Sequence, residues 1–581
     1  MLFPKLLPKG TSTTWYLLYS QRVLVKKYVN TRLLEMAHES HVGFAEYLKC
    51  LNEGQFYNFC SILPPNIDDD LKLEFVIDEL LRVLSRGEET RDLTVKYFAQ
   101  KSLVYLRQQE LIVLIQKWIA EAADDNLSLE QGATYIAQWF QPMKIVTLSK
   151  IQQELDSLAN LVKESLNTTS PKHPVLNNGA LFTSEDVKEL SWTTVECKQV
   201  IQAIESVFKP LFNNSFKKYF KPDNSYINLV LERRQGIPIT LCLVVMCVAR
   251  RLGVALEPVN FPQHFILRWK EFPLKQGIEQ YRFIDAFNGS YNLNFETLIK
   301  GLSMQSAMVG PEHCDSCTNI QVLQRMLRNL ISLGKEGQYK QGLNLLHHAV
   351  ELYNLLIPDD VEKQVLSVKI TLHHMINLPS AISKIQEIMA ERPDLRDLLI
   401  HLQDECEKVL KQISKGHTPK RDPPKRRADN PQVVFSIGMV MKHRLFNYMC
   451  VIRGWDSTCK ASEHWINQMG VDQCERGRHQ PFYNVWVMDG SDRYAAEENL
   501  IFARKPRMIK HPEVGSLFES FNGRYYVPGR ELQQDYPDDL QTTHEAITQF
   551  CEEGGEEDME DDINVLDDDS GKFPNIISYK F

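Results

Sequence analysis

The chain has 581 residues and a formal net charge of −9 at pH 7; 43% of its residues are hydrophobic and 24% are charged. This length predicts three or four domains, and the composition is typical of globular proteins and excludes a wholly disordered or fibrous chain. The excess of acidic side chains argues against a protein that binds nucleic acid over its whole surface, although a local basic patch is compatible with it.

Twelve cysteines are scattered along the chain without a regular framework, which is typical of free thiols in a reducing compartment. The first ten residues, MLFPKLLPKG, carry positive charge and two prolines where a signal peptide needs an apolar core. The longest uncharged run, residues 235–249, is too short to span a bilayer. We therefore expect no membrane association, and a location in the cytoplasm with the nucleus as an additional site.

Residues 1–165 are expected to be helical. Apolar residues recur at i, i+3, i+4 and i+7 within 71–86 (LKLEFVIDELLRVLSR) and within 92–121, and proline and glycine are rare there. The pattern predicts a helical scaffold.

Residues 166–310 mix helical patterns with short strands. The segments 255–261 (ALEPVNF), 264–270 (HFILRWK) and 281–287 (YRFIDAF) are rich in β-forming residues and are bounded by proline, glycine or charge. They predict an α+β domain.

Residues 319–413 return to helix, and the stretch GQYKQGLNLLHHAVELY at 337–353 resembles a tetratricopeptide helix pair. Residues 414–432 hold four prolines and several basic residues, which predicts a linker that could also act as a localisation signal.

Residues 433–535 alternate apolar and polar positions in several short runs, and Asp489-Gly490 and Asn522-Gly523 are strong hairpin signals. They predict a small β-barrel. Residues 550–581 are rich in acidic side chains and predict a disordered tail, which would repel the phosphates of nucleic acid.

The segment RRQGIPITLCLVVMCVARRLGVALEPVNFPQHFILRWK at 233–270 contains the residue types of a Cys-His-Asp hydrolase. In such enzymes the cysteine lies at a helix N-terminus, the histidine deprotonates it and the aspartate orients the histidine. The helix is expected to begin at Pro238, whose first turn offers only the hydroxyl of Thr240. Cys242 lies in an apolar run typical of a core. His264 and Asp285 therefore remain as vestigial catalytic candidates or as a buried hydrogen-bonded pair.

The segment 236–287 resembles the SirB1-type transglutaminase-like domain, and residues 435–500 resemble the YccV/HspQ-like domain, also called the hemimethylated-DNA-binding domain. The anchors of the second resemblance are Gly438, His443, Gly454, Trp455, Asp456, Pro481, Phe482, Tyr483, Asp489, Gly490 and Tyr494. The order of a helical region, a transglutaminase-like domain, tetratricopeptide-like helices and a YccV-like domain is similar to the F-box only protein 21 family. The fold class expected is multidomain α+β.

This resemblance implies a non-catalytic substrate receptor of a Skp1–cullin–F-box ubiquitin ligase, with protein substrates and no cofactor. SirB1-type domains commonly keep the transglutaminase-like fold without its cysteine, which agrees with the missing nucleophile near Thr240. The stretch MLFPKLLPKG leads directly into the region that follows the F-box in this family. We therefore expect a truncated or F-box-less relative, for which docking to the Skp1–cullin complex stays open. A cryptic transglutaminase-like hydrolase is the alternative for the domain at 166–310.

The YccV-like segment offers candidate binding residues for a peptide or a nucleic-acid strand: His443, Trp455, Asp456, Pro481, Phe482, Tyr483 and Tyr494. Exposed aromatic rings could stack on bases, whereas the other interpretation places the rings in the core and Asp456 at a turn. DNA binding needs basic side chains that face phosphate. The candidates are Lys442, His443, Arg444, Arg453, Lys460, Arg476, Arg478 and His479. Acidic residues are interleaved with them, so we favour a protein ligand over DNA.

The motif HCDSC contains His313, Cys314 and Cys317. A structural zinc site needs four ligands and usually a second such pair, which the sequence lacks. No metal site is predicted there.

Overall fold

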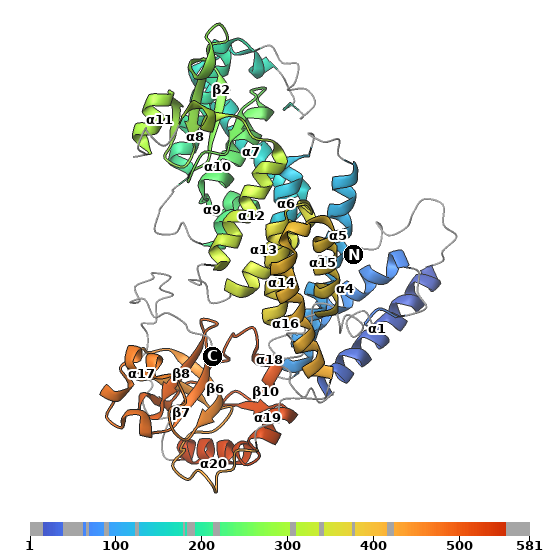
Figure 1. The fold of residues 1–581 in the computed structure, drawn as a ribbon, viewed down its shortest axis with the longest axis vertical. Coiled ribbons are helices and arrows are strands. Elements are labelled where there is room, and N and C mark those ends of the chain that lie inside the picture. Colours follow the sequence, from blue (N-terminus) through green and yellow to red (C-terminus); the bar gives the residue numbers. More distant parts are fainter. Residues whose placement is uncertain are drawn as a thin grey trace. The chain divides into compact units, whose positions relative to one another are not determined.

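A computed structural model describes residues 15–38, 62–64, 69–85, 92–121, 127–177, 181–182, 192–212, 221–302, 310–335, 342–374, 378–414 and 423–552. The chain divides into two compact units, one of residues 107–367 and one that joins residues 1–106 to residues 368–581. Helices and strands occur in both units, so the expected multidomain α+β class is confirmed (Figure 1).

The unit of residues 107–367 is built on helices that surround one very apolar helix. These helices are α6 (Leu129–Phe140), α7 (Leu148–Thr169), α8 (Thr194–Leu211), α9 (Ile227–Arg233) and α10 (Pro238–Arg251). Side chains satisfy the free N–H groups at several starts: Thr193 and Glu196 form a reciprocal capping box at α8. Helix α10 begins at Pro238, as expected, and twelve of its fourteen residues are buried. Because α10 is apolar on every side, it is the central helix of this domain.

A four-stranded antiparallel sheet packs beside these helices in the order β1-β2-β3-β4. Its strands are β1 (Glu257–Val259), β2 (Ile266–Lys270), β3 (Tyr281–Asp285) and β4 (Ser290–Leu293). The first three lie in the segments that the sequence predicts, and β4 was not predicted. The core formed with α11 (Phe295–Gly301) includes Val259, Phe261, Ile266 and Phe283. The sheet places the ends of β2 and β3 next to α10.

Two further helices, α12 (Asn319–Lys335) and α13 (Gly342–Leu356), pack closely against each other. A side chain added at Gly334 would lie 2.8 Å from the backbone of Leu346, so only glycine permits this approach. Helices α5 (Leu93–Glu121) and α14 (Val361–His374) run through the boundaries of the unit.

The other unit combines N-terminal helices with the C-terminal part of the chain. Its helices are α1 (Trp15–His38), α4 (Asp69–Ser85), the first turns of α5, α15 (Leu378–Glu391) and α16 (Arg396–Ser414). Helix α1 buries Leu18, Val25, Val29, Leu33 and Met36 against residues of α4 and α5. This spacing of three, four and seven residues is the helical period.

The C-terminal β domain has a five-stranded antiparallel sheet in the order β8-β7-β6-β5-β9 and a two-stranded sheet β10-β11. The strands are β5 (Val440–His443), β6 (Met449–Asp456), β7 (Phe482–Val487), β8 (Asp492–Ala496), β9 (Leu500–Phe502), β10 (Phe518–Phe521) and β11 (Tyr526–Pro528). Among these strands β8 and β9 form the edges, so the ladder is an open sheet rather than a closed barrel. Its helices are α17 (Glu463–Met469), α18 (Val514–Leu517), α19 (Arg530–Asp535) and α20 (Asp539–Glu552).

Turn chemistry explains both hairpins of this domain. Gly490 lies between β7 and β8 and Gly523 between β10 and β11, and both have a positive φ. This conformation carries no steric penalty in glycine. Both hairpins predicted from the sequence are therefore present.

Three of the predicted domain limits can be compared with the structure. Helix α7 runs through the expected limit at residue 165 and ends at Thr169. Of the linker at 414–432, residues 415–422 lie outside the described part, whereas 423–432 pack on the β domain through Lys425 and Arg427. The acidic tail at 550–581 lies outside the described residues beyond Glu552. No helix among the described residues is long and apolar enough to cross a bilayer.

Candidate functional site

The structure brings together His264 and Asp285, the two residues that the sequence leaves as catalytic candidates. His264 lies just before β2 and Asp285 ends β3, and Nε2 of the histidine is 3.0 Å from Oδ1 of the aspartate. Their side chains are 11% and 3% exposed. Asn288 supports the aspartate, since its backbone N–H donates to Oδ1 and its amide donates to Oδ2. A dyad is thus held at the strand ends.

The electrostatics of Asp285 favour its ionised form. Burial alone would raise the pKa of this carboxyl, but the hydrogen bond and charge of His264, with the bonds from Asn288, outweigh burial and hold the pKa below its ordinary value. An ionised aspartate beside an imidazole orients that ring, as in hydrolase triads.

The candidates for the third member of a triad, Thr240 and Cys242, both lie buried in α10. The hydroxyl of Thr240 is buried; it lies 3.1 Å from the backbone N–H of Ile237 and 2.9 Å from the carbonyl oxygen of Asn224. Its hydrogen-bonding capacity is used to cap the helix. Cys242 is fully buried and its thiol faces the carbonyl oxygen of Phe265 at 3.5 Å.

The thiol of Cys242 is also kept protonated. Burial, and after it the negative charge of Asp285, raise the pKa of this cysteine well above its ordinary range. A nucleophilic cysteine needs the opposite shift. His264 and Asp285 are therefore placed as a dyad, while Thr240 and Cys242 are occupied in the core.

A cavity of about 250 Å³ opens beside the dyad, between α8, α10 and the loop that follows β3. Its lining combines the side chains of Phe208, Phe212 and Phe287 with the polar residues Lys209 and Asn288. Phe287 also touches His264, since their rings lie edge to face with centroids 6.4 Å apart. His264 itself is not part of the lining, so the imidazole contacts the wall of the cavity only through Phe287 among these residues.

Most of the candidate binding residues of the β domain are buried. Trp455, Phe482, Tyr483 and His443 are 1%, 2%, 0% and 4% exposed, and Pro481 is also buried. Such rings have no face to offer to a base or a peptide, so the interpretation as core is the one that the structure supports. The expectation that they form an exposed binding groove is corrected accordingly.

Each polar atom in this core has a specific partner. The indole N–H of Trp455 donates to Asp539 at 2.9 Å, and the hydroxyl of Tyr483 donates to Glu497 at 2.6 Å. Burial, and after it the charge of Arg493, lowers the pKa of His443 to about 4, so its ring is neutral at pH 7. These partners fix side chains of distant segments rather than a ligand.

Asp456 and Tyr494 are only partly buried, and they bind each other and the segment before β5. The hydroxyl of Tyr494 donates to Asp456 at 2.9 Å, and the Lys425 ammonium donates to the same carboxylate at 2.8 Å. Lys425 also donates to the carbonyl oxygen of Trp455 at 2.6 Å. A basic residue of the predicted linker is therefore used to attach that segment to the β domain.

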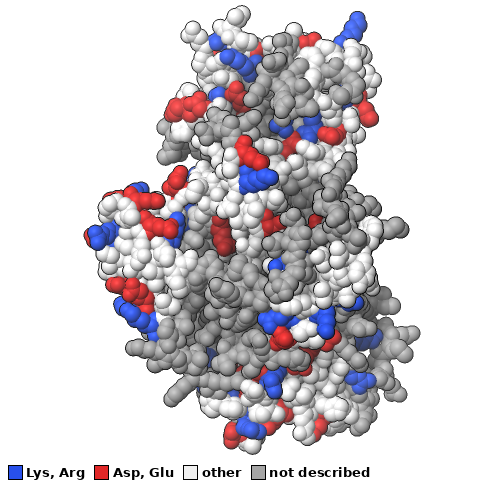
Figure 2. All heavy atoms as spheres, turned by 90° about the vertical axis from the view of Figure 1, so that its right-hand side faces the viewer, with Lys and Arg blue, Asp and Glu red and all other residues white. Residues whose placement is uncertain are grey.

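Three of the basic candidates for phosphate contact, Arg453, Arg476 and Arg478, are paired with acidic neighbours. Arg478 pairs with Asp472 and Glu463 at 2.6 and 2.8 Å, and Arg476 pairs with Glu497 at 3.0 Å. Figure 2 shows basic and acidic side chains interspersed among the described residues of the face it presents. This arrangement gives no extended positive surface for a phosphate backbone on that face.

One possible metal site was missed by the sequence analysis. His347, His348 and Glu351 on α13 place one ligand atom each within 4.8 Å of the others. The signal in the sequence is HHAVE, since residues three and four positions apart share a helix face. The HCDSC motif does not form such a group in the described part of the chain. Its Cys314 is buried and its Cys317 is partly buried.

Comparisons with known sequences agree with the two domain resemblances. The sequence model of the transglutaminase-like superfamily matches residues 149–328, and that of the hemimethylated DNA-binding protein YccV-like family matches residues 433–525. A UPF0162 protein from Xylella fastidiosa is 35% identical over 128 residues, which cover 21% of this chain and 43% of that protein. No solved structure matches the chain.

The longest similarities extend through both domains. F-box only protein 21 from Pongo abelii is 37% identical over 484 residues, which cover 81% of this chain and 75% of that protein. The human F-box only protein 21 is 36% identical over 494 residues with the same coverage. Sequence identity at this level over most of both chains shows that the chain belongs to the F-box only protein 21 family.

Proposed function

We propose that the chain is a substrate-recognition subunit that presents proteins for ubiquitination, and that ligase activity is supplied by its partners. The observation that carries the proposal is the similarity to F-box only protein 21 over 81% of the chain. The relatives are named for an F-box, the element that links a substrate receptor to a Skp1–cullin complex. We propose a cytoplasmic location for this activity.

The geometry of the transglutaminase-like domain supports a role in binding rather than in covalent chemistry. The candidate hydroxyl of Thr240 and the thiol of Cys242 are buried and hydrogen-bonded, whereas a cavity opens beside Phe287, which contacts His264. A domain that keeps a cavity while both of these candidate nucleophiles are buried is suited to hold part of a protein substrate. The proposal therefore assigns no bond-making step to this chain.

Co-expression of the full chain with Skp1 and a cullin tests the proposed assembly. We expect the three proteins to elute together in size-exclusion chromatography and to add ubiquitin to co-purified proteins when charged E2 enzyme is supplied. Elution of the chain apart from Skp1 and the cullin would remove the docking part of the proposal. A matched control is His401→Gln, which removes an exposed imidazole of α16 and should leave ubiquitination unchanged.

A second function, DNA binding, is favoured by one observation, the match of residues 433–525 to the hemimethylated DNA-binding YccV-like family. Lys442, Arg444 and Lys460 are the basic candidates without a described carboxylate partner at ion-pair distance. A gel-shift titration of the full chain with hemimethylated and unmethylated duplexes at low salt tests it. A shift that weakens steeply with salt and is lost in Lys442→Ala/Lys460→Ala would support DNA binding, and no shift at low salt would remove it.

A further inference from the structure

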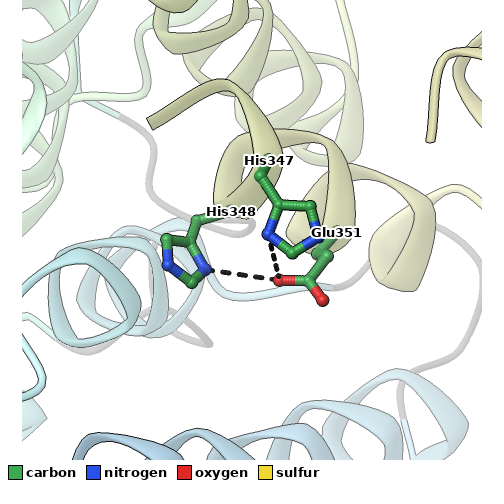
Figure 3. A group of neighbouring side chains, drawn as sticks. All are labelled: His347, His348 and Glu351. Carbon is green, nitrogen blue, oxygen red and sulfur yellow. Dashed lines mark hydrogen bonds and ion pairs between the residues drawn. The ribbon is translucent and has the colours of Figure 1, made fainter. Parts of the chain in front are cut away.

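Helix α13 brings three metal-ligating side chains to one place outside the dyad and the β domain. Nδ1 of His348 lies 3.3 Å from Oε2 of Glu351, and Nδ1 of His347 lies 3.7 Å from the same oxygen. Figure 3 shows both imidazoles turned toward this carboxylate from adjacent positions of the helix. The two ring nitrogens and the carboxylate oxygen all lie within 4.8 Å of one another.

These separations match the spacing of ligands around a metal ion. Atoms that lie about 2.0–2.1 Å from a tetrahedral zinc are about 3.3–3.4 Å from one another. The separations of 3.3 and 3.7 Å depart from this value by at most a few tenths of an ångström. The two imidazole nitrogens lie within 4.8 Å of each other, so rotation of the two rings has to bring them closer together for all three atoms to reach coordination distance.

The exposure of the three groups also suits a metal, because an ion has to reach its ligands from solvent. The side chains of His347, His348 and Glu351 are 11%, 34% and 38% exposed, which leaves a path from solvent.

Residues of neighbouring helices position the group. The indole N–H of Trp139 on α6 donates to the carbonyl oxygen of His348 at 3.0 Å, which holds this turn of α13 in place. The amide nitrogen of Gln108 on α5 lies 3.5 Å from Nδ1 of His348. Nδ1 of His348 cannot accept from Gln108 while it donates to Glu351. A bound metal would lie in front of this nitrogen, so metal binding requires the Gln108 amide to turn away.

We propose that His347, His348 and Glu351 form a binding site for a divalent transition metal of the zinc class. The ligands are Nδ1 of both imidazoles and the carboxylate of Glu351, and a water completes a tetrahedral set. A set of two imidazoles and one carboxylate selects such ions over Mg²⁺ or Ca²⁺, which prefer oxygen alone. The site is independent of the proposed role in ubiquitination.

Zinc titration of the chelator-treated full chain tests the proposal. We expect one Zn²⁺ per chain that is lost or weakened at least about tenfold in Glu351→Gln and in His348→Gln, since loss of even an outer partner of a ligand costs this much. Glu351→Gln preserves size and helix, so it decides the outcome if His348→Gln fails to fold. X-ray absorption should find nitrogen and oxygen neighbours at about 2.0–2.1 Å and no sulfur at about 2.3 Å.

Two control variants separate this site from general effects. Gln108→Ala keeps all three ligands and removes their competitor, so it should bind Zn²⁺ at least as tightly as the parent chain. His401→Gln removes an exposed imidazole of α16 and should leave binding unchanged. Unchanged zinc binding in Glu351→Gln, sulfur ligands in the absorption spectrum, or no zinc binding by the parent chain would each overturn the proposal.

Discussion

The transglutaminase-like domain and the C-terminal β domain use the same kinds of polar residues in opposite ways. In the first, His264 and Asp285 meet at the ends of two strands, and Phe287, which contacts the imidazole, lines a cavity of about 250 Å³. In the second, His443 and Trp455 are buried, and the indole donates to Asp539. In the first domain the polar pair lies near a cavity. In the second domain the polar groups form hydrogen bonds that join distant segments of the same domain.

The comparison teaches that a cluster of aromatic and charged residues does not by itself indicate a ligand site. Asp539 at the start of α20 accepts hydrogen bonds from Arg427, Trp455 and the backbone N–H of Ile437. Three residues that lie 84 or more positions before it in sequence therefore depend on one carboxylate. A buried charge with this many donors is a structural centre, and its loss leaves the donors unpaired.

Asp539→Ala is expected to have the largest effect of the changes considered. Removal of one partner of a buried ion pair costs about 3–5 kcal/mol because the other charge is left without compensation. Hydrogen exchange of β6 in the full chain should accelerate accordingly, while exchange of β2 and β3 stays as in the parent chain. Arg426→Ala is the matched control: its pair with Asp538 is largely exposed and should contribute about 0–1 kcal/mol. Equal effects of the two changes would contradict a central role of Asp539.

Acidification should weaken the β domain before the transglutaminase-like domain. The folded-state pKa of His443 is about 4, below its ordinary value of 6.5, so the unfolded chain binds the proton more readily. Stability from the neutral ring is complete above pH 6.5 and is lost as the pH falls toward 4, by an amount on the order of 2–3 kcal/mol. The groups that face this ring are Arg493 and the aromatic rings of Phe446 and Tyr448.

Asp285 lies in the transglutaminase-like domain and its pKa is lowered, so this domain should lose stability at a lower pH than the β domain. A carboxyl with a depressed pKa stabilises the fold above its unfolded pKa of about 3.9 and loses this contribution only as the pH falls further. Hydrogen exchange of β5 and of β3 between pH 7 and 4.5 measures how the stability of each domain depends on pH. His443→Gln should flatten the profile of β5, and a profile unchanged by this substitution would exclude His443 as its source.

The smallest expected effect concerns Cys242. A buried thiol with a raised pKa should resist alkylation in the folded chain and react only after unfolding, whereas the partly exposed Cys197 and Cys459 should react earlier. His264→Ala should not change the labelling of Cys242, as read by mass spectrometry of peptides. Rapid labelling of Cys242 that disappears in His264→Ala would instead support the cryptic hydrolase.

Much of the local structure could be predicted from the sequence. The start of α10 at Pro238, the strands at 257–259, 266–270 and 281–285 and the turns at Gly490 and Gly523 all follow from local signals. Helical period, β-forming composition and positive-φ glycine act over a few residues, and so the sequence displays them directly. The short strand β4 carries no such run, and its pairing with β3 could not be read from it.

The sequence by itself therefore determined the start of α10, three of the four strands of its sheet, both hairpins and the family of this chain. Only the tertiary structure decided which polar side chains remain near a cavity and which are buried. The indole of Trp455 meets Asp539 across 84 positions, and Thr240 meets the carbonyl of Asn224 across 16. Local periodicity can mark a residue as facing inward, but the partner that satisfies its polar atom is chosen by packing between distant segments.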